Sequence, residues 1–212
     1  MKNRITIVDY GIGNLFSVRR ALAVCGATNV NISDRGDDLL HSDKIILPGV
    51  GAFEAGIIGL HERSLVASII KAANEGIPIL GICLGMQLMA TISEEFGLHK
   101  GLSLIPGKVQ PIPQYDRNGN QLKMPFIGWS TLIPNNALAD DDGCLAGTTN
   151  RSVYLVHSYQ FIPDDPSHLL ASYDYGGNLV TAAVRNKNVL GVQFHPEKSG
   201  SVGLSIIANF IK

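Results

Sequence analysis

The sequence predicts a single α/β domain with a mostly parallel central sheet, helices on both faces of that sheet, and antiparallel strands added late in the chain. Short apolar runs alternate with helical patterns through the first half, which is typical of strand–helix–strand crossovers. The second half is rich in β-forming runs separated by turn residues. The 212 residues contain no segment of linker composition, and this length suits one hydrophobic core.

The first half of the chain supplies the predicted parallel strands and the helices between them. Asn14 can cap the first helix, and Pro48-Gly49 ends the third strand. The predicted strands are residues 5–8, 30–33, 44–47 and the apolar run 77–82, and the predicted helices are 15–24, 64–75 and 85–92.

The second half supplies the predicted antiparallel strands. Asn118-Gly119 and Gly176-Gly177-Asn178 indicate hairpin turns. A helix over residues 204–211 closes the chain. The predicted strands include residues 154–156, 170–175, 180–185 and 189–194.

Composition excludes several classes of protein. The net charge is −1 with no long basic run, so we expect no nucleic-acid partner. No apolar run approaches the roughly 20 residues that span a membrane. The cysteines Cys25, Cys83 and Cys144 are far apart and form no CxxC pair, which argues against a disulfide framework or a zinc site. We expect a soluble cytoplasmic protein with no metal or organic cofactor.

The segment around Cys83 predicts a nucleophile. A strand leads into Gly81-Ile82-Cys83-Leu84-Gly85, and a helix follows, which is the pattern of a nucleophile elbow with cysteine in place of serine. A helix N-terminus favours the thiolate, and the Leu84 amide would face a developing oxyanion. On this segment alone, a small buried cysteine is an equally good interpretation.

A candidate base lies near the C-terminus. The strand ending at Phe194 delivers His195, and Glu197 can orient its imidazole from two residues away. Taken singly, each residue could be an ordinary surface group. Together with Cys83 they form a nucleophile, base and acid in that order. His157 is the one rival base, and we interpret it as a residue that lines the pocket.

A second oxyanion donor is predicted at Gly49-Val50-Gly51, where glycines around Val50 let a backbone amide approach a ligand. In a doubly wound sheet, the end of this strand and the elbow should lie at the same edge. An ordinary turn is the alternative interpretation, and it would hold if the third strand were distant from the elbow.

Two segments of the chain resemble the class I (triad) glutamine amidotransferases. They are Gly81 through Gln87 and Phe194-His195-Pro196-Glu197. Within that class, the chain resembles the glutaminase subunits of imidazole glycerol phosphate synthase. The further segments that carry this resemblance are residues 9–15, 47–53, 101–102, 104–107, 128–129, 156–159 and 191–200.

The resemblance implies a flavodoxin-like three-layer α/β sandwich over residues 1–212, acting as one glutamine amidotransferase type 1 domain. It implies that Cys83 attacks the glutamine side-chain amide to form a thioester, that His195 shuttles protons and that Glu197 orients His195. The residues that it implies for the oxyanion hole and for glutamine binding are Gly49, Val50, Gly51, Leu84, Gln87, Ser158 and Tyr159.

The resemblance also implies a partner, a (βα)8-barrel cyclase that receives ammonia through a tunnel. Asn14, Trp129 and Lys198 match positions that the family uses at this interface. Each has a simpler interpretation, because Asn14 could only cap a helix, Trp129 could belong to the core and Lys198 could be solvated.

One segment departs from the family pattern. The family usually has a His before an Ile-Gly-Trp or Met-Gly-Trp element and an Asn after it, whereas this chain reads Pro125-Phe126-Ile127-Gly128-Trp129-Ser130. Some members of the group serve a sugar amidotransferase in surface-polysaccharide synthesis, so the identity of the partner stays open at this point. A non-catalytic flavodoxin-like binding module is a third hypothesis, and the intact Cys83, His195 and Glu197 argue against it.

Overall fold

The computed structural model describes residues 3–134, 143–148 and 150–212. Its central element is an eight-stranded sheet in the order β2-β1-β3-β4-β14-β13-β12-β9. Five neighbouring strands are parallel: β2 (Val30–Ser33), β1 (Ile5–Val8), β3 (Lys44–Gly49), β4 (Ile79–Cys83) and β14 (Val189–Val192). The antiparallel extension consists of β13 (Asn178–Asn186), β12 (Leu169–Tyr175) and β9 (Ile133–Pro134). The predicted fold class is confirmed.

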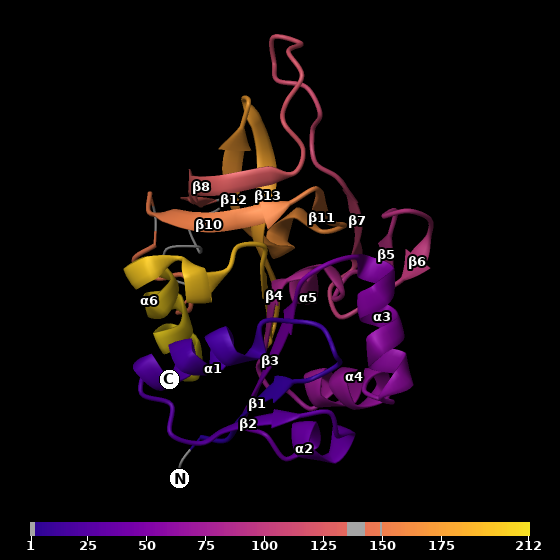
Figure 1. Cartoon of the computed structure of the whole chain (residues 1–212), viewed down its shortest axis with the longest axis vertical. Helices are drawn as coiled ribbons and strands as arrows, with labels where there is room; N and C mark the ends of the chain where they lie inside the picture. Colours follow the sequence, from indigo (N-terminus) through magenta and orange to yellow (C-terminus); the bar gives the residue numbers. More distant parts are fainter. Residues whose placement is uncertain (1–2, 135–142, 149) are drawn as a thin grey trace.

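Helices cover both faces of the parallel strands and make three layers (Figure 1). On β3, Ile46 packs into one core cluster, whereas Ile45 and Leu47 pack into the other. This alternation is the period of two that a strand buried on both faces requires. One layer contains α1 (Leu15–Val24) and α6 (Gly200–Ile211), and the other contains α3 (Phe53–Glu62) and α4 (Val66–Asn74), with α2 (Gly36–Leu40) packed against α4.

Two smaller sheets extend the molecule beyond the carboxyl end of β4 (Figure 1). One is a ribbon of β8 (Phe126–Thr131) and β10 (Ser152–His157). The backbone amide of His195, just after β14, donates to the Tyr154 carbonyl of β10 at 3.0 Å, so this ribbon lies across the edge of the parallel strands. The other sheet has the order β11 (Tyr159–Pro163), β7 (Gly107–Pro111), β5 (Ile92–Ser93) and β6 (His99–Lys100).

The helix predicted over residues 85–92 is wrong in length. The observed helix α5 covers only Leu84–Gln87, and Ile92 begins β5. The carbonyls that would continue the helix are taken by a distant segment, because those of Leu88 and Met89 accept hydrogen bonds from the Leu102 and Leu104 amides at 2.8 and 2.9 Å. Tertiary hydrogen bonds therefore override a local helical pattern.

Other boundaries shift by a few residues. The last helix begins at Gly200 instead of residue 204, and α4 begins at Val66 instead of residue 64. Helices α2 and α3 were not predicted from the sequence. Among the described residues, no helix has both the length and the apolar character needed to cross a membrane.

Candidate active site

Three neighbouring strands bring the predicted site residues to one edge of the sheet. β3 and β4 pair in parallel with Gly49 opposite Cys83, and β4 and β14 pair with Ile82 opposite Val192. The chain segments that follow these strands therefore start side by side. The expectation that the glycine turn after β3 and the elbow after β4 share an edge is confirmed.

Cys83 has the backbone geometry of a nucleophile elbow, with φ 54° and ψ −111°. A residue with a side chain adopts this conformation only under strain, and such strain concentrates at functional sites. The neighbouring glycines are needed for space. A Cβ at Gly85 would lie 1.8 Å from the Leu47 carbonyl oxygen, and one at Gly81 would lie 2.6 Å from the Met89 side chain.

His195 and Glu197 form a buried pair. His195 Nδ1 lies 2.8 Å from Glu197 Oε1, and the two side chains are only 3% and 1% exposed. Because a carboxylate accepts at this distance, Nδ1 is the protonated nitrogen and Nε2 is left for the sulfur. Burial alone would lower the pKa of His195, but its hydrogen bonds to Cys83 and Glu197, together with their negative charges, raise that pKa to about 9.

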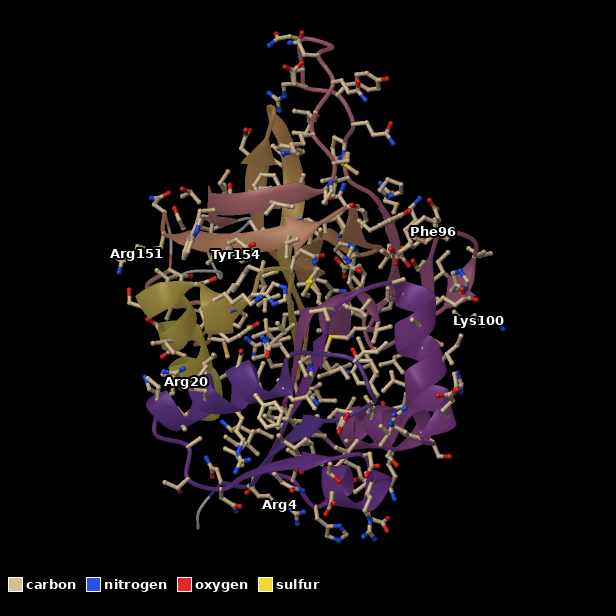
Figure 2. The ribbon with its side chains drawn as sticks, viewed as in Figure 1. Arg4, Arg20, Phe96, Lys100, Arg151 and Tyr154 are labelled. Carbon is tan, nitrogen blue, oxygen red and sulfur yellow. The ribbon has the colours of Figure 1, made fainter. Side chains whose placement is uncertain are left out.

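The 3₁₀ turn that follows His195 and contains Glu197 (Pro196–Lys198) is held against β10. Ser199 Oγ donates to the His195 carbonyl at 2.7 Å and accepts from the Tyr154 amide at 2.9 Å. Tyr154 lies on β10 (Figure 2), the strand whose Val156 carbonyl lies 4.0 Å from Cys83 Sγ. The same strand therefore contacts the histidine and the cysteine.

His157, the rival base, is held in a neutral form. Its Nδ1 lies 2.8 Å from the Tyr159 carbonyl and its Nε2 lies 2.9 Å from the Tyr173 hydroxyl. The carbonyl only accepts, so Nδ1 donates and Nε2 accepts from Tyr173. Burial lowers the pKa of His157 to about 4. Its ring contributes to the wall of the cavity, and both of its nitrogens are occupied.

A cavity of about 280 Å³ opens in front of the cysteine. Its size suits a small amino acid better than a nucleotide. Gly49 is not part of its lining, and a Cβ at this position would meet the Tyr10 hydroxyl and Leu84. Across the described ranges, no group of three potential ligands is placed to hold a metal ion. The lining residues are Val50, Gly51, Cys83, Leu84, Gln87, Glu95, Val156, His157, Ser158, Tyr159 and His195.

Two polar residues of the site were missed in the sequence. Glu95 lines the cavity, and its Oε2 accepts from the Phe53 amide at 2.7 Å. Burial raises the pKa of Glu95, and the hydrogen bond from Phe53 opposes that rise. Gln193 is fully buried next to Cys83. Only one signal could have indicated Gln193, a polar residue inside the mostly apolar run that was predicted as a strand over residues 189–194.

The three residues expected at an interface lie outside the cavity. Trp129 is 57% exposed on β8, so it is not a core residue. Lys198 is exposed on the turn after His195. Asn14 caps α1 by accepting from the Ser17 amide at 3.3 Å. Phe126, at the position where the family usually has His, packs its ring against Tyr173.

Comparisons with known proteins identify the family of this chain. The family model of glutamine amidotransferase class-I matches residues 6–212. The chain is 43% identical over 212 residues to "Imidazole glycerol phosphate synthase subunit HisH 1" of Legionella pneumophila (strain Paris), covering 98% of each chain. It is 42% identical over 219 residues to subunit HisH of Zymomonas mobilis, covering 100% of this chain and 98% of the other.

Solved structures share the fold at lower identity. The structure of PurLQS from Thermotoga maritima superposes with a TM-score of 0.67 at 23% identity, covering 99% of this chain and 98% of the other. The glutaminase domain of Trypanosoma brucei CTPS gives 0.63 at 20% identity, covering 98% and 93%. The family model and the relatives at 42–43% identity show that the chain belongs to the class-I glutamine amidotransferase family and, within it, to the HisH subunits.

Proposed function

We propose that this chain hydrolyses the side-chain amide of glutamine to glutamate and ammonia, as the glutaminase subunit of an imidazole glycerol phosphate synthase in histidine biosynthesis. The observation that carries the proposal is that Cys83, at a strained elbow, and His195, which Glu197 orients, line the same cavity close enough for Cys83 to raise the pKa of His195. The near-full-length identity to HisH subunits supports the pathway. We also propose that residues 1–212 act as one domain in the cytoplasm, where the three free cysteines would stay reduced.

The proposed reaction starts from a thiolate and an imidazolium. The Cys83 sulfur attacks the carboxamide carbon of glutamine, and the amides of Leu84 and Val50 stabilise the oxyanion. His195 gives its proton to the departing nitrogen, which leaves as ammonia. The resulting thioester is attacked by water, which His195 deprotonates, and glutamate is released as the sulfur becomes free again.

The other cavity residues would hold the amino-acid part of the substrate. Glu95 presents a carboxylate at the cavity, which suits the ammonium group of glutamine. Gln87, Gly51, Ser158 and Tyr159 line the same cavity and offer amide, hydroxyl and backbone groups to the substrate.

Replacement of the nucleophile tests the activity. Cys83→Ala should abolish ammonia release from glutamine, measured with a glutamate dehydrogenase-coupled assay in the presence of the partner. Cys144→Ala is the matched control because Cys144 is also a free cysteine but does not line the cavity. A glutamine-analogue electrophile should label the Cys83 peptide alone. Ammonia release retained by Cys83→Ala would rule out this nucleophile.

We propose a (βα)8-barrel cyclase as the partner, with Asn14, Trp129 and Lys198 at the interface. Gly51 has a φ of 96°, and the freedom of the glycines around Val50 would let one peptide plane reorient when the partner docks. The isolated chain should therefore be weakly active and strongly stimulated by the partner and its ligand. Full activity of the isolated chain, unchanged by any partner, would contradict this coupling.

The altered segment around Phe126 leaves one competing partner to test. Immobilised chain should capture the cyclase and not a sugar amidotransferase when both are offered at equal concentration. Capture of the sugar amidotransferase alone would replace the histidine-pathway assignment while leaving the glutaminase chemistry intact.

A further inference from the structure

Gln193 is a polar residue at a fully buried position, where an apolar side chain would be expected. It follows the apolar strand β14 and is 0% exposed. Leaving a buried amide without partners costs about 1–3 kcal/mol, so such a side chain persists where its hydrogen bonds are made. Its backbone amide donates to the Ala182 carbonyl at 2.8 Å, which ties it to β13.

The Gln193 side chain joins two residues of the cavity. Its Oε1 accepts from Gln87 Nε2 at 2.9 Å, and its Nε2 lies 3.6 Å from Cys83 Sγ, within hydrogen-bond reach of sulfur. Gln87 Nε2 also donates to the Tyr159 carbonyl at 3.0 Å. We call this chain of contacts from Tyr159 through Gln87 and Gln193 to Cys83 the amide relay.

The direction of the amide relay is fixed by its first member. The Tyr159 carbonyl can only accept, so the group that Gln87 turns toward it must be the NH₂. The same NH₂ faces Gln193, which must therefore present its oxygen. That leaves the Gln193 NH₂ to face the sulfur, so the orientation of both amides follows from one backbone carbonyl.

We propose that Gln193 is a positioning residue of the glutaminase site, which holds the Cys83 sulfur and the Gln87 amide in register through the amide relay. This inference rests on the proposed function. A neutral N–H donor stabilises a sulfur anion without offering a proton, so it does not compete with His195 as an acid. The opposite contact, from the sulfur to the Val156 carbonyl, can form only with the protonated thiol.

Two variants of Gln193 separate the roles of its two ends. Gln193→Met keeps the approximate volume and removes both polar ends. Gln193→Glu keeps an acceptor for Gln87 and replaces the donor to Cys83 with an oxygen. The matched control is Gln160→Met. Gln160 is also buried, at 4% exposed, but its side chain accepts a hydrogen bond of 3.2 Å from the Thr181 amide and makes no hydrogen bond to Cys83.

The decisive measurement is the rate of Cys83 alkylation by iodoacetamide as a function of pH, followed by mass spectrometry. Both Gln193 variants should shift the pH of half-maximal rate upward by about one unit, with the larger shift in Gln193→Glu. With the partner present, kcat for glutamine should fall about tenfold in both, and KM should rise more in Gln193→Met, which also frees Gln87. Gln160→Met should match the wild type.

Alkylation profiles and kcat values equal to those of Gln160→Met would overturn the inference. If Gln193→Met fails to fold, the inference is tested by the alkylation profile of Gln193→Glu and by the NMR spectra of the wild type. In the wild type, the side-chain ¹⁵N–¹H signals of Gln193 should shift over the pH range in which alkylation accelerates, and signals that stay constant count against the relay. A wild type that releases no ammonia with its partner refutes the proposed function, while the alkylation profiles still test the relay.

Discussion

At the scale of single residues, His195 determines the pH response of the site. Its pKa is raised to about 9 by Cys83 and Glu197 despite its burial. Glu197→Gln removes the carboxylate that favours the imidazolium, so the His195 ring should titrate at a lower pH in NMR spectra of the variant. An unchanged titration would contradict the role assigned to Glu197.

The same shift has a consequence for stability. The pKa of His195 is higher in the folded chain, about 9, than its ordinary value of 6.5, so protonation stabilises the fold. This contribution is fully present below pH 6.5 and is lost as the pH rises through 9. The stability advantage of the wild type over Glu197→Gln in urea unfolding should therefore be larger at pH 6 than at pH 9.5.

The strained backbone of Cys83 predicts a difference between two inactive variants. Cys83→Ala and Cys83→Gly both lose the sulfur, but only glycine adopts a φ of 54° without strain. Cys83→Gly should exceed Cys83→Ala in free energy of unfolding by about 1 kcal/mol, measured by denaturant titration. An alanine variant of equal or greater stability would mean that the elbow stores no strain.

At the scale of elements, the sequence predicted the strands of the parallel sheet better than the helices, while the strands β5 to β9 and β11 were not predicted. A strand such as Ile5–Val8 is a short apolar run bounded by polar and turn residues, so local pattern is enough. Helix α5 is short because distant amides take its carbonyls. Helix α3 was missed because its Gly56 and Gly59 weaken the local pattern, yet a Cβ at Gly59 would lie 2.5 Å from the Tyr10 carbonyl oxygen and one at Gly56 would lie 3.1 Å from the Leu88 side chain.

In the site, too, residues that local sequence marks could be predicted, and residues that depend on distant contacts could not. Cys83, His195 and Glu197 could be predicted because each lies next to a strand end with recognisable glycines or proline. Glu95 and Gln193 could not, since their importance depends on which atoms they contact across the fold. The position of Glu95 depends on the amide of Phe53, which is distant in sequence.

The junction of β3 and α5 gives a prediction about packing. Gly85→Ala would place a methyl group 1.8 Å from the Leu47 carbonyl oxygen, so the strand and the elbow must separate. The variant should lose about 3 kcal/mol of unfolding free energy. Gly143→Ala is the control, because its methyl group would meet open space, and it should change stability by less than about 0.5 kcal/mol. Equal stability of the two variants would contradict the observed close approach.

At the scale of the whole molecule, exposed apolar side chains occur near the cavity. Val50 lines the cavity and is exposed, and Trp129 is exposed on β8 of the ribbon that crosses the sheet edge. Phe96, on the turn between β5 and β6, is exposed as well (Figure 2), and its ring lies 6.2 Å from that of Tyr159, another cavity residue. Exposed apolar groups of this kind are typical of a surface that a partner covers.

Trp129 offers a direct test of partner docking because it is the only tryptophan in the chain. With 5-fluorotryptophan incorporated into this chain alone, the ¹⁹F spectrum should show one signal that shifts when the cyclase is added, since the half-exposed ring would lose water. Trp129→Ala should weaken cyclase binding about tenfold or more in calorimetry. Val24→Ala, at the far end of α1, is a similarly exposed apolar control and should bind normally. A fluorine signal that stays in place at saturating cyclase would remove β8 from the interface.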